Sequence, residues 1–157
     1  MKIKQVALIA GIALCLDGGA NAATSTTSAT PTTPTPEQQC AYNGQDYQVA
    51  MQVEQKIQKA LKANSVSDFA TVLTYPLRVN VGSSKHYQVK SVKEMMIRYP
   101  TIMTPTMQQY ILADDPKQIF CNDQGVMIGR GSIWFLAGKS GPSRFIINRI
   151  SVQSSQS

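Results

Sequence analysis

Apolar residues recur at helical spacing in the first part of the folded region. Between Asp46 and Ala63 they fall on one face, and three lysines collect toward the C-terminal end, where positive charge is favourable. That face consists of Ala50, Val53, Ile57, Ala60 and Leu61. The spacing predicts a long helix that ends at Asn64, followed by a short helix that Ser65 caps.

From Tyr75 the pattern changes to strict alternation. Apolar and polar residues alternate over 75–81 and again over 85–90, on either side of the turn sequence Gly82-Ser83-Ser84. The length of this turn predicts a hairpin in which Arg78 and Asn80 share the outer face with His86 and Gln88.

Two more capped helices and a strand-rich end follow. Ser91 opens a capping box for a helix that Pro100 is expected to end, and Thr104-Pro105 opens the next helix. Strands are predicted over 118–121, 125–136 and 144–152. Within the second, Gly129 and Gly131 indicate a bend or bulge, and alternation puts Arg130, Ser132 and Trp134 on one face and Met127 on the other.

The order of these elements predicts an α+β domain, and several of its segments resemble the nuclear transport factor 2-like superfamily, a cystatin-like α+β cone. The similar segments are YPLRVN at 75–80, GVMIGRGSIWF at 125–135, the capped helix at Ser91 and the final three strands. The closer resemblance is to exported bacterial members of unknown function, over about residues 45–152. It implies a strongly bent antiparallel sheet wrapped around the N-terminal and middle helices.

The first 37 residues have the composition of an export signal and a tether. Residues 1–22 combine Lys2 and Lys4, an apolar run and a small-residue site, which predicts a signal peptide cleaved after Ala22. A retained anchor and a lipidated Cys15 are the alternatives. Residues 23–37, rich in Thr, Ser and Pro, predict a disordered tether, residues 38–153 a single domain and 154–157 a flexible tail. We therefore expect the protein to be periplasmic or secreted, and we expect no membrane span in the mature chain.

Cleavage would remove Cys15 and leave Cys40 and Cys121. Two cysteines in an exported protein are more often paired than free, so we expect a disulfide that links the start of the domain to a late strand. Two unpaired buried thiols remain the alternative. A metal site is not expected, because His86 is the only histidine.

No catalytic residue is predicted from the sequence. The superfamily that the chain resembles includes ketosteroid isomerase and related dehydratases, whose chemistry needs an acid and a base with shifted pKa values inside the cone. The acidic residues here fall in the tether, in helices or in turns, although a helix could aim one of them inward. We therefore lean against an enzyme, expect no cofactor, and leave enzymatic activity open.

Positive charge follows the predicted sheet. Basic residues lie on or at the ends of its strands with no acidic residue among them, and the mature chain would keep 13 basic and 8 acidic residues, a net charge near +5. The candidate binding residues are Arg78, His86, Arg130, Trp134 and Arg149. A basic sheet face favours an anionic ligand or an acidic protein surface, and not nucleic acid, as the partner. The alternative is that the lysines and arginines only solvate the strands and keep their edges from pairing with other chains.

The function expected from these patterns is that of a non-enzymatic periplasmic binding module. An immunity or inhibitor protein that blocks an envelope toxin or hydrolase through the concave sheet fits a stand-alone exported domain of this size. The alternatives are a small-molecule enzyme or ligand-binding protein that uses the cone cavity, and an accessory component of an envelope secretion assembly. The oligomeric state is left open, a dimer included.

Overall fold

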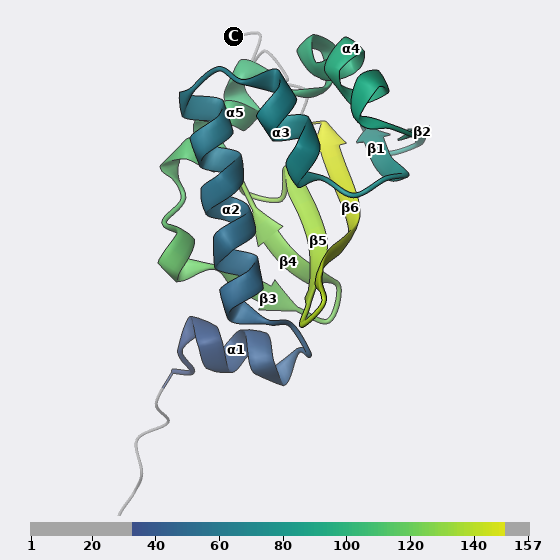
Figure 1. Cartoon of the computed structure of the whole chain (residues 1–157). Coiled ribbons are helices and arrows are strands. Elements are labelled where there is room, and N and C mark those ends of the chain that lie inside the picture. Colours follow the sequence, from purple (N-terminus) through teal and green to yellow (C-terminus); the bar gives the residue numbers. More distant parts are fainter. Residues whose placement is uncertain (1–32, 150–157) are drawn as a thin grey trace, which may run out of the picture. The chain divides into compact units, whose positions relative to one another are not determined.

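A computed structural model of the protein describes residues 33–149 (Figure 1). Over this range it contains five α-helices, one short 3-10 helix and six strands. In chain order these are α1 (Pro36–Tyr42), α2 (Tyr47–Lys62), α3 (Val66–Val72), β1 (Leu77–Val81), β2 (Lys85–Val89), α4 (Val92–Ile102), α5 (Pro105–Ala113), η1 (Pro116–Gln118), β3 (Phe120–Asn122), β4 (Gly125–Ile128), β5 (Ile133–Gly138) and β6 (Gly141–Arg149). The predicted signal peptide and most of the predicted tether lie outside the described residues.

The strands form one open, mixed sheet in the order β2-β1-β6-β5-β4-β3. Four of the five strand pairs are antiparallel, but β1 runs parallel to β6, with Val79 opposite Ile147. The expectation of a purely antiparallel sheet is therefore wrong. A parallel neighbour needs a long crossover connection, and here two α-helices, one 3-10 helix and four strands separate β1 from β6 along the chain.

The predicted helix starts are confirmed by their caps. The side chains of Asp46, Ser65, Ser91 and Thr104 each accept a hydrogen bond from the backbone N–H three residues later. Each cap satisfies one of the donors that the first turn of a helix leaves without a partner. Pro100, however, lies inside the last turn of α4 and does not end it.

Helices α2 and α3 cover one face of the sheet and enclose the core between the two layers (Figure 1). The inward residues of the strands are fully buried, among them Leu77, Val79, Ile133, Phe135, Phe145 and Ile147. They pack against the apolar stripe of α2, and the rings of Phe135 and Phe145 stack with their centroids 5.1 Å apart. The opposite face of the sheet carries Arg78, His86 and Trp134, and the hairpin register confirms that Arg78 and Asn80 share a face with His86 and Gln88.

The predicted strand over 125–136 is two strands. Residues 129–132 form a turn in which Gly129, Arg130 and Gly131 all have positive φ angles, of 61°, 55° and 86°. The turn resets the alternation, so Met127 pairs with Trp134 across the β4–β5 hairpin and Ser132 is buried. A register shift does occur, but between Trp134 and Leu136 rather than at the glycines.

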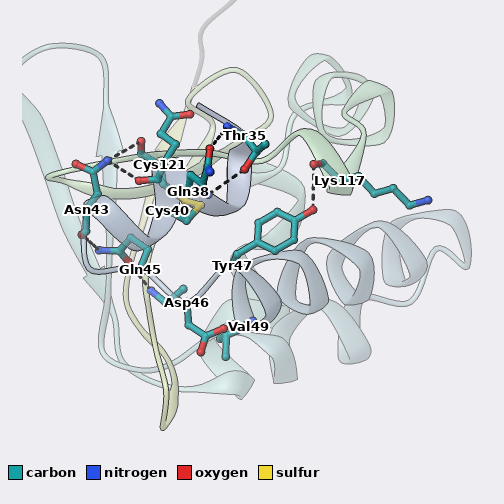
Figure 2. Close-up of a disulfide and its surroundings, with 12 residues drawn as sticks. Thr35, Gln38, Cys40, Asn43, Gln45, Asp46, Tyr47, Val49, Lys117 and Cys121 are labelled. Carbon is teal, nitrogen blue, oxygen red and sulfur yellow. Dashed lines mark hydrogen bonds between the residues drawn. A yellow bond between two sulfur atoms is a disulfide. The ribbon is translucent and has the colours of Figure 1, made fainter. Parts of the chain in front are cut away.

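The disulfide is present between Cys40 and Cys121, whose Cα atoms are 4.9 Å apart (Figure 2). Cys40 lies in α1, a helix that the sequence pattern did not predict and that takes in the last two residues of the expected tether. The side-chain amide of Asn43 reinforces the link by donating to the backbone carbonyl of Cys121. A disulfide is consistent with an oxidising compartment. Within residues 33–149, no helix combines the length and the apolar character that crossing a bilayer requires.

Candidate functional site

Three of the five candidate binding residues meet in one hollow at the β1–β2 end of the sheet. Arg78, His86 and Arg149 line a cavity of about 250 Å³, which we call the basic cleft. Its remaining lining residues are Asn80, Gly82, Ser83, Ser84, Lys85 and Asn148. Three side chains with a full positive charge and two hydroxyls thus surround a space with no carboxylate in its lining, which is the chemistry of an anion site.

A chain of hydrogen bonds positions the guanidinium of Arg78 in this cleft. Its Nε donates to Oδ1 of Asn80 at 2.7 Å, and the amide of Asn80 donates to Oδ1 of Asn148 at 2.8 Å. Asn148 in turn donates to the carbonyl of Gly131 at 2.9 Å. Only one of the five guanidinium N–H groups is used in this chain, so the others remain available to an anion, and the side chain is already oriented.

Trp134 lies on the same sheet face, beside the basic cleft and not in it. It lines a separate hollow of about 170 Å³ together with Gln124 and Ile146, and that hollow shares Asn80 and Asn148 with the basic cleft. The half-buried indole therefore offers an apolar surface next to the cationic one. This combination of an aromatic anchor with arginine is typical of protein interfaces.

Arg130 is not part of this surface. Arg130 lies in the β4–β5 turn and not on a strand face, and its guanidinium lies over the ring of Tyr110 in α5, 4.6 Å from the ring centroid. It lines a different hollow of about 300 Å³, which we call the acidic cavity. The expectation that Arg130 shares a face with Trp134 fails because the turn breaks the alternation of the strand.

The acidic cavity also contains a buried carboxyl. Glu54, on α2, is only 1 % exposed, and its Oε1 atom has no hydrogen-bond partner among the described residues. Asp114 and Asp115 line the same cavity, as do Ala113, Gln118, Ile119, Phe120, Met127 and Arg130. Buried polar atoms in folded proteins nearly always have a partner, so an unpartnered carboxylate oxygen at the wall of a cavity marks a candidate binding point.

Burial raises the pKa of Glu54 to about 8, and the negative charges of Asp114 and Asp115 add to the shift. The carboxyl is therefore mostly protonated and neutral at pH 7. A carboxyl group that titrates near neutral pH in a cavity is characteristic of functional sites.

Glu54 was missed because no strand carries it, but the helical pattern contains the signal. Residues 50, 53, 57 and 61 define the buried stripe of α2, and both Glu54 and Gln58 fall within that stripe. Gln58 has a structural use, because its amide donates to the carbonyls of Ile111 and Asp114. Glu54 has no such contact, and that difference can be seen only in the tertiary structure.

Gly129 holds the turn against α5, and this predicts a stability effect. A Cβ atom at this position would lie 2.4 Å from Cγ1 of Ile111, in a backbone with φ +61°. Gly129→Ala should lower the free energy of unfolding by about 3 kcal/mol, from left-handed strain and overpacking together. Chemical denaturation measures the loss.

Gly44→Ala is the matched control for this substitution. Its φ angle of +68° is nearly the same, but nothing lies within 4 Å of the added Cβ, so about 1 kcal/mol is expected. Equal losses in the two variants would contradict the close approach of the turn to α5.

Within the described part of the chain, no group of three or more His, Cys, Asp or Glu side chains is placed to hold a metal ion. A larger hollow of about 430 Å³ lies beside the start of α2, but its lining mixes Glu37 and Asp46 with Lys139, and no unpartnered buried atom faces it. The basic cleft and the acidic cavity are thus the two candidate sites.

No protein family, no curated protein and no solved structure matches the chain.

Proposed function

We propose that the protein is a non-enzymatic binding module that engages an acidic protein surface through the basic cleft. The observation that carries this proposal is the meeting of Arg78, Lys85, His86 and Arg149 around one hollow without a carboxylate. The hydrogen-bonded orientation of Arg78 supports it, because a pre-positioned arginine loses little freedom when it binds a carboxylate. Trp134 supplies apolar contact area beside the charges.

The role that we propose is that of an exported immunity or inhibitor protein acting in the periplasm. The disulfide supports export to an oxidising compartment, and the net charge of +6 of the full chain supports an acidic partner. The alternative role is that of an accessory component of an envelope secretion assembly, and a protein in that role would also bind its partner through the basic cleft. Membership of the nuclear transport factor 2-like superfamily and a cone-like sheet remain part of the proposal, supported by the order of helices and strands.

The basic cleft can be tested by charge removal at matched positions. Arg78→Gln should weaken partner binding about tenfold, because a charge-assisted hydrogen bond contributes on the order of 1.5–3 kcal/mol and an exposed cleft is partly screened by salt. Capture from the envelope fraction by the chain that begins at Ala23 identifies the partner, and titration of Trp134 fluorescence with it gives the affinity.

Arg144→Gln is the control for this experiment. Arg144 is an exposed arginine on the same strand as Arg149 but outside the cleft, so its removal changes the net charge equally. Retained binding by Arg144→Gln with loss by Arg78→Gln supports the cleft. Equal losses of affinity in the two variants would mean that binding depends only on the net charge of the protein. Unchanged binding by both variants would contradict the proposal that the basic cleft is the binding site.

A second candidate function, the binding or turnover of a small molecule, is favoured by the carboxyl of Glu54 in the acidic cavity. At about 300 Å³ this cavity lies at the lower end of the range for small-molecule sites, and it combines apolar walls with a few polar groups. Within the described residues its lining contains no serine, cysteine or histidine, so any chemistry there would have to use carboxyl groups.

A further inference from the structure

We propose that the acidic cavity binds a small organic amine, whose ammonium group donates a hydrogen bond to Glu54 and is attracted by the charges of Asp114 and Asp115. This inference rests on the second candidate function and names its ligand class. It concerns a site separate from the basic cleft, so the two proposals can fail independently.

The buried carboxyl of Glu54 lacks a hydrogen-bond donor, and a ligand in the acidic cavity could supply one. This carboxyl is buried under α5 and the β4–β5 hairpin, and it makes no hydrogen bond to the described residues. A buried acceptor without a partner is costly, and a ligand N–H group would remove that cost. An ammonium group carries three such donors.

The charge of the cavity selects a cation. Asp114 accepts a hydrogen bond from the backbone N–H of Gly129, and Asp115 accepts one from that of Lys117, so each keeps an oxygen for a ligand. The one positive lining residue, Arg130, is held against the ring of Tyr110. The two aspartates outweigh it, and the imbalance grows when Glu54 ionises.

The remaining lining of the acidic cavity favours a ligand with an organic body. Within residues 33–149, no three His, Cys, Asp or Glu side chains are placed together to hold a metal ion. Ala113, Ile119, Phe120 and Met127 form apolar walls instead. A short alkyl or aryl group attached to the ammonium would cover these walls and lose contact with water.

Binding should release a proton. The free Glu54 carboxyl is mostly protonated at pH 7, because burial, helped by the negative charges of Asp114 and Asp115, raises its pKa to about 8. An ammonium group beside it favours the ionised form, so the proton leaves as the cation binds. The affinity should therefore rise about tenfold from pH 6 to pH 7 and level off above pH 8.

The test uses three probes of similar size that differ in charge: 2-phenylethylamine, 3-phenylpropionate and 2-phenylethanol. Calorimetry in two buffers of different ionisation enthalpy measures affinity and proton release, and the ¹³C resonance of the Glu54 carboxyl reports its ionisation. We expect binding of the amine alone, with release of nearly one proton at pH 7.

Variants locate the binding event. Glu54→Gln should weaken amine binding at least tenfold and abolish proton release, and Asp115→Asn should weaken binding while it keeps the capping oxygen of η1. Asp123→Asn, which removes a carboxylate from the β3–β4 turn, should bind as the parent chain does.

Two results would overturn the inference. Binding of the carboxylate or the alcohol with no binding of the amine would mean that the ligand class is wrong, while the small-molecule site survives. No binding of any probe, or amine binding that both Glu54→Gln and Asp115→Asn leave unchanged, would remove the site itself and the second candidate function with it. Neither result affects the basic cleft.

Discussion

Loss of the Cys40–Cys121 disulfide is expected to lower the free energy of unfolding by about 4 kcal/mol. The bond closes a loop with a sequence separation of 81 residues, and the entropy of such a loop in the unfolded chain sets this magnitude. Thermal melting of the chain that begins at Ala23, with and without a reductant, should show a fall of about 15 °C in Tm.

The loss should be unevenly distributed over the structure. Helix α1 is short, and only Cys40 of its residues is fully buried, so the disulfide and the Asn43 hydrogen bond to Cys121 hold it against β3 (Figure 2). Hydrogen exchange should show α1 unprotected after reduction, while α2 and β5 keep their protection.

The Cys40→Ser, Cys121→Ser double variant provides the control. It should melt at the lower temperature in both conditions, because no cysteine remains after residue 22 for the reductant to act on. A reductant effect of less than about 1 kcal/mol on the parent chain would contradict the stabilising role of the bond.

Glu54 is expected to make stability fall as the pH rises. The pKa of this carboxyl is about 8 in the folded chain and near 4.5 in the unfolded chain, so the folded state holds the extra proton between these values. The contribution is fully present below pH 4.5, is lost progressively as the pH rises to about 8, and is constant above that. The slope can reach about 1.4 kcal/mol per pH unit, which makes this the second large effect.

Glu54→Gln isolates this contribution, because the amide has the shape of the protonated acid and does not ionise. Urea denaturation at pH 5, 6, 7 and 8 should show the variant gaining stability over the parent chain at each step. Other acidic groups cancel in this difference; the pKa of Glu94, for example, is lowered by the backbone N–H of Lys90 in both chains. A difference that stays constant with pH would mean that Glu54 titrates as an exposed carboxyl does.

The parts of the fold that the sequence predicted are those with local causes. Capping side chains at Asp46, Ser65, Ser91 and Thr104 bond to their own first turn, so helix starts can be recognised without tertiary information. The hairpin register follows from a short turn between two alternating segments. The disulfide could be predicted because only two cysteines follow the predicted signal peptide, residues 1–22.

The errors have non-local causes. A continuous strand was predicted over 125–136 because the alternation of apolar and polar residues gives no sign of a turn. In that turn Arg130 takes a left-handed conformation between two glycines. The parallel pairing of β1 with β6 depends on how segments far apart in the chain return to each other. Helix α1 is too short to produce a periodic pattern, and it is held by the disulfide.

The sequence by itself therefore determined the residue types available for function and the local elements that carry them. It placed Arg78 and His86 on one sheet face because strand periodicity is a local property. Only the tertiary structure decided which residues meet. Arg149 lies in the basic cleft because β1 pairs with β6, whereas Arg130 lies in the acidic cavity because it belongs to the β4–β5 turn. The unpartnered carboxyl of Glu54 emerged in the same way, because burial and the lack of a hydrogen-bond partner depend on segments that pack from elsewhere in the chain.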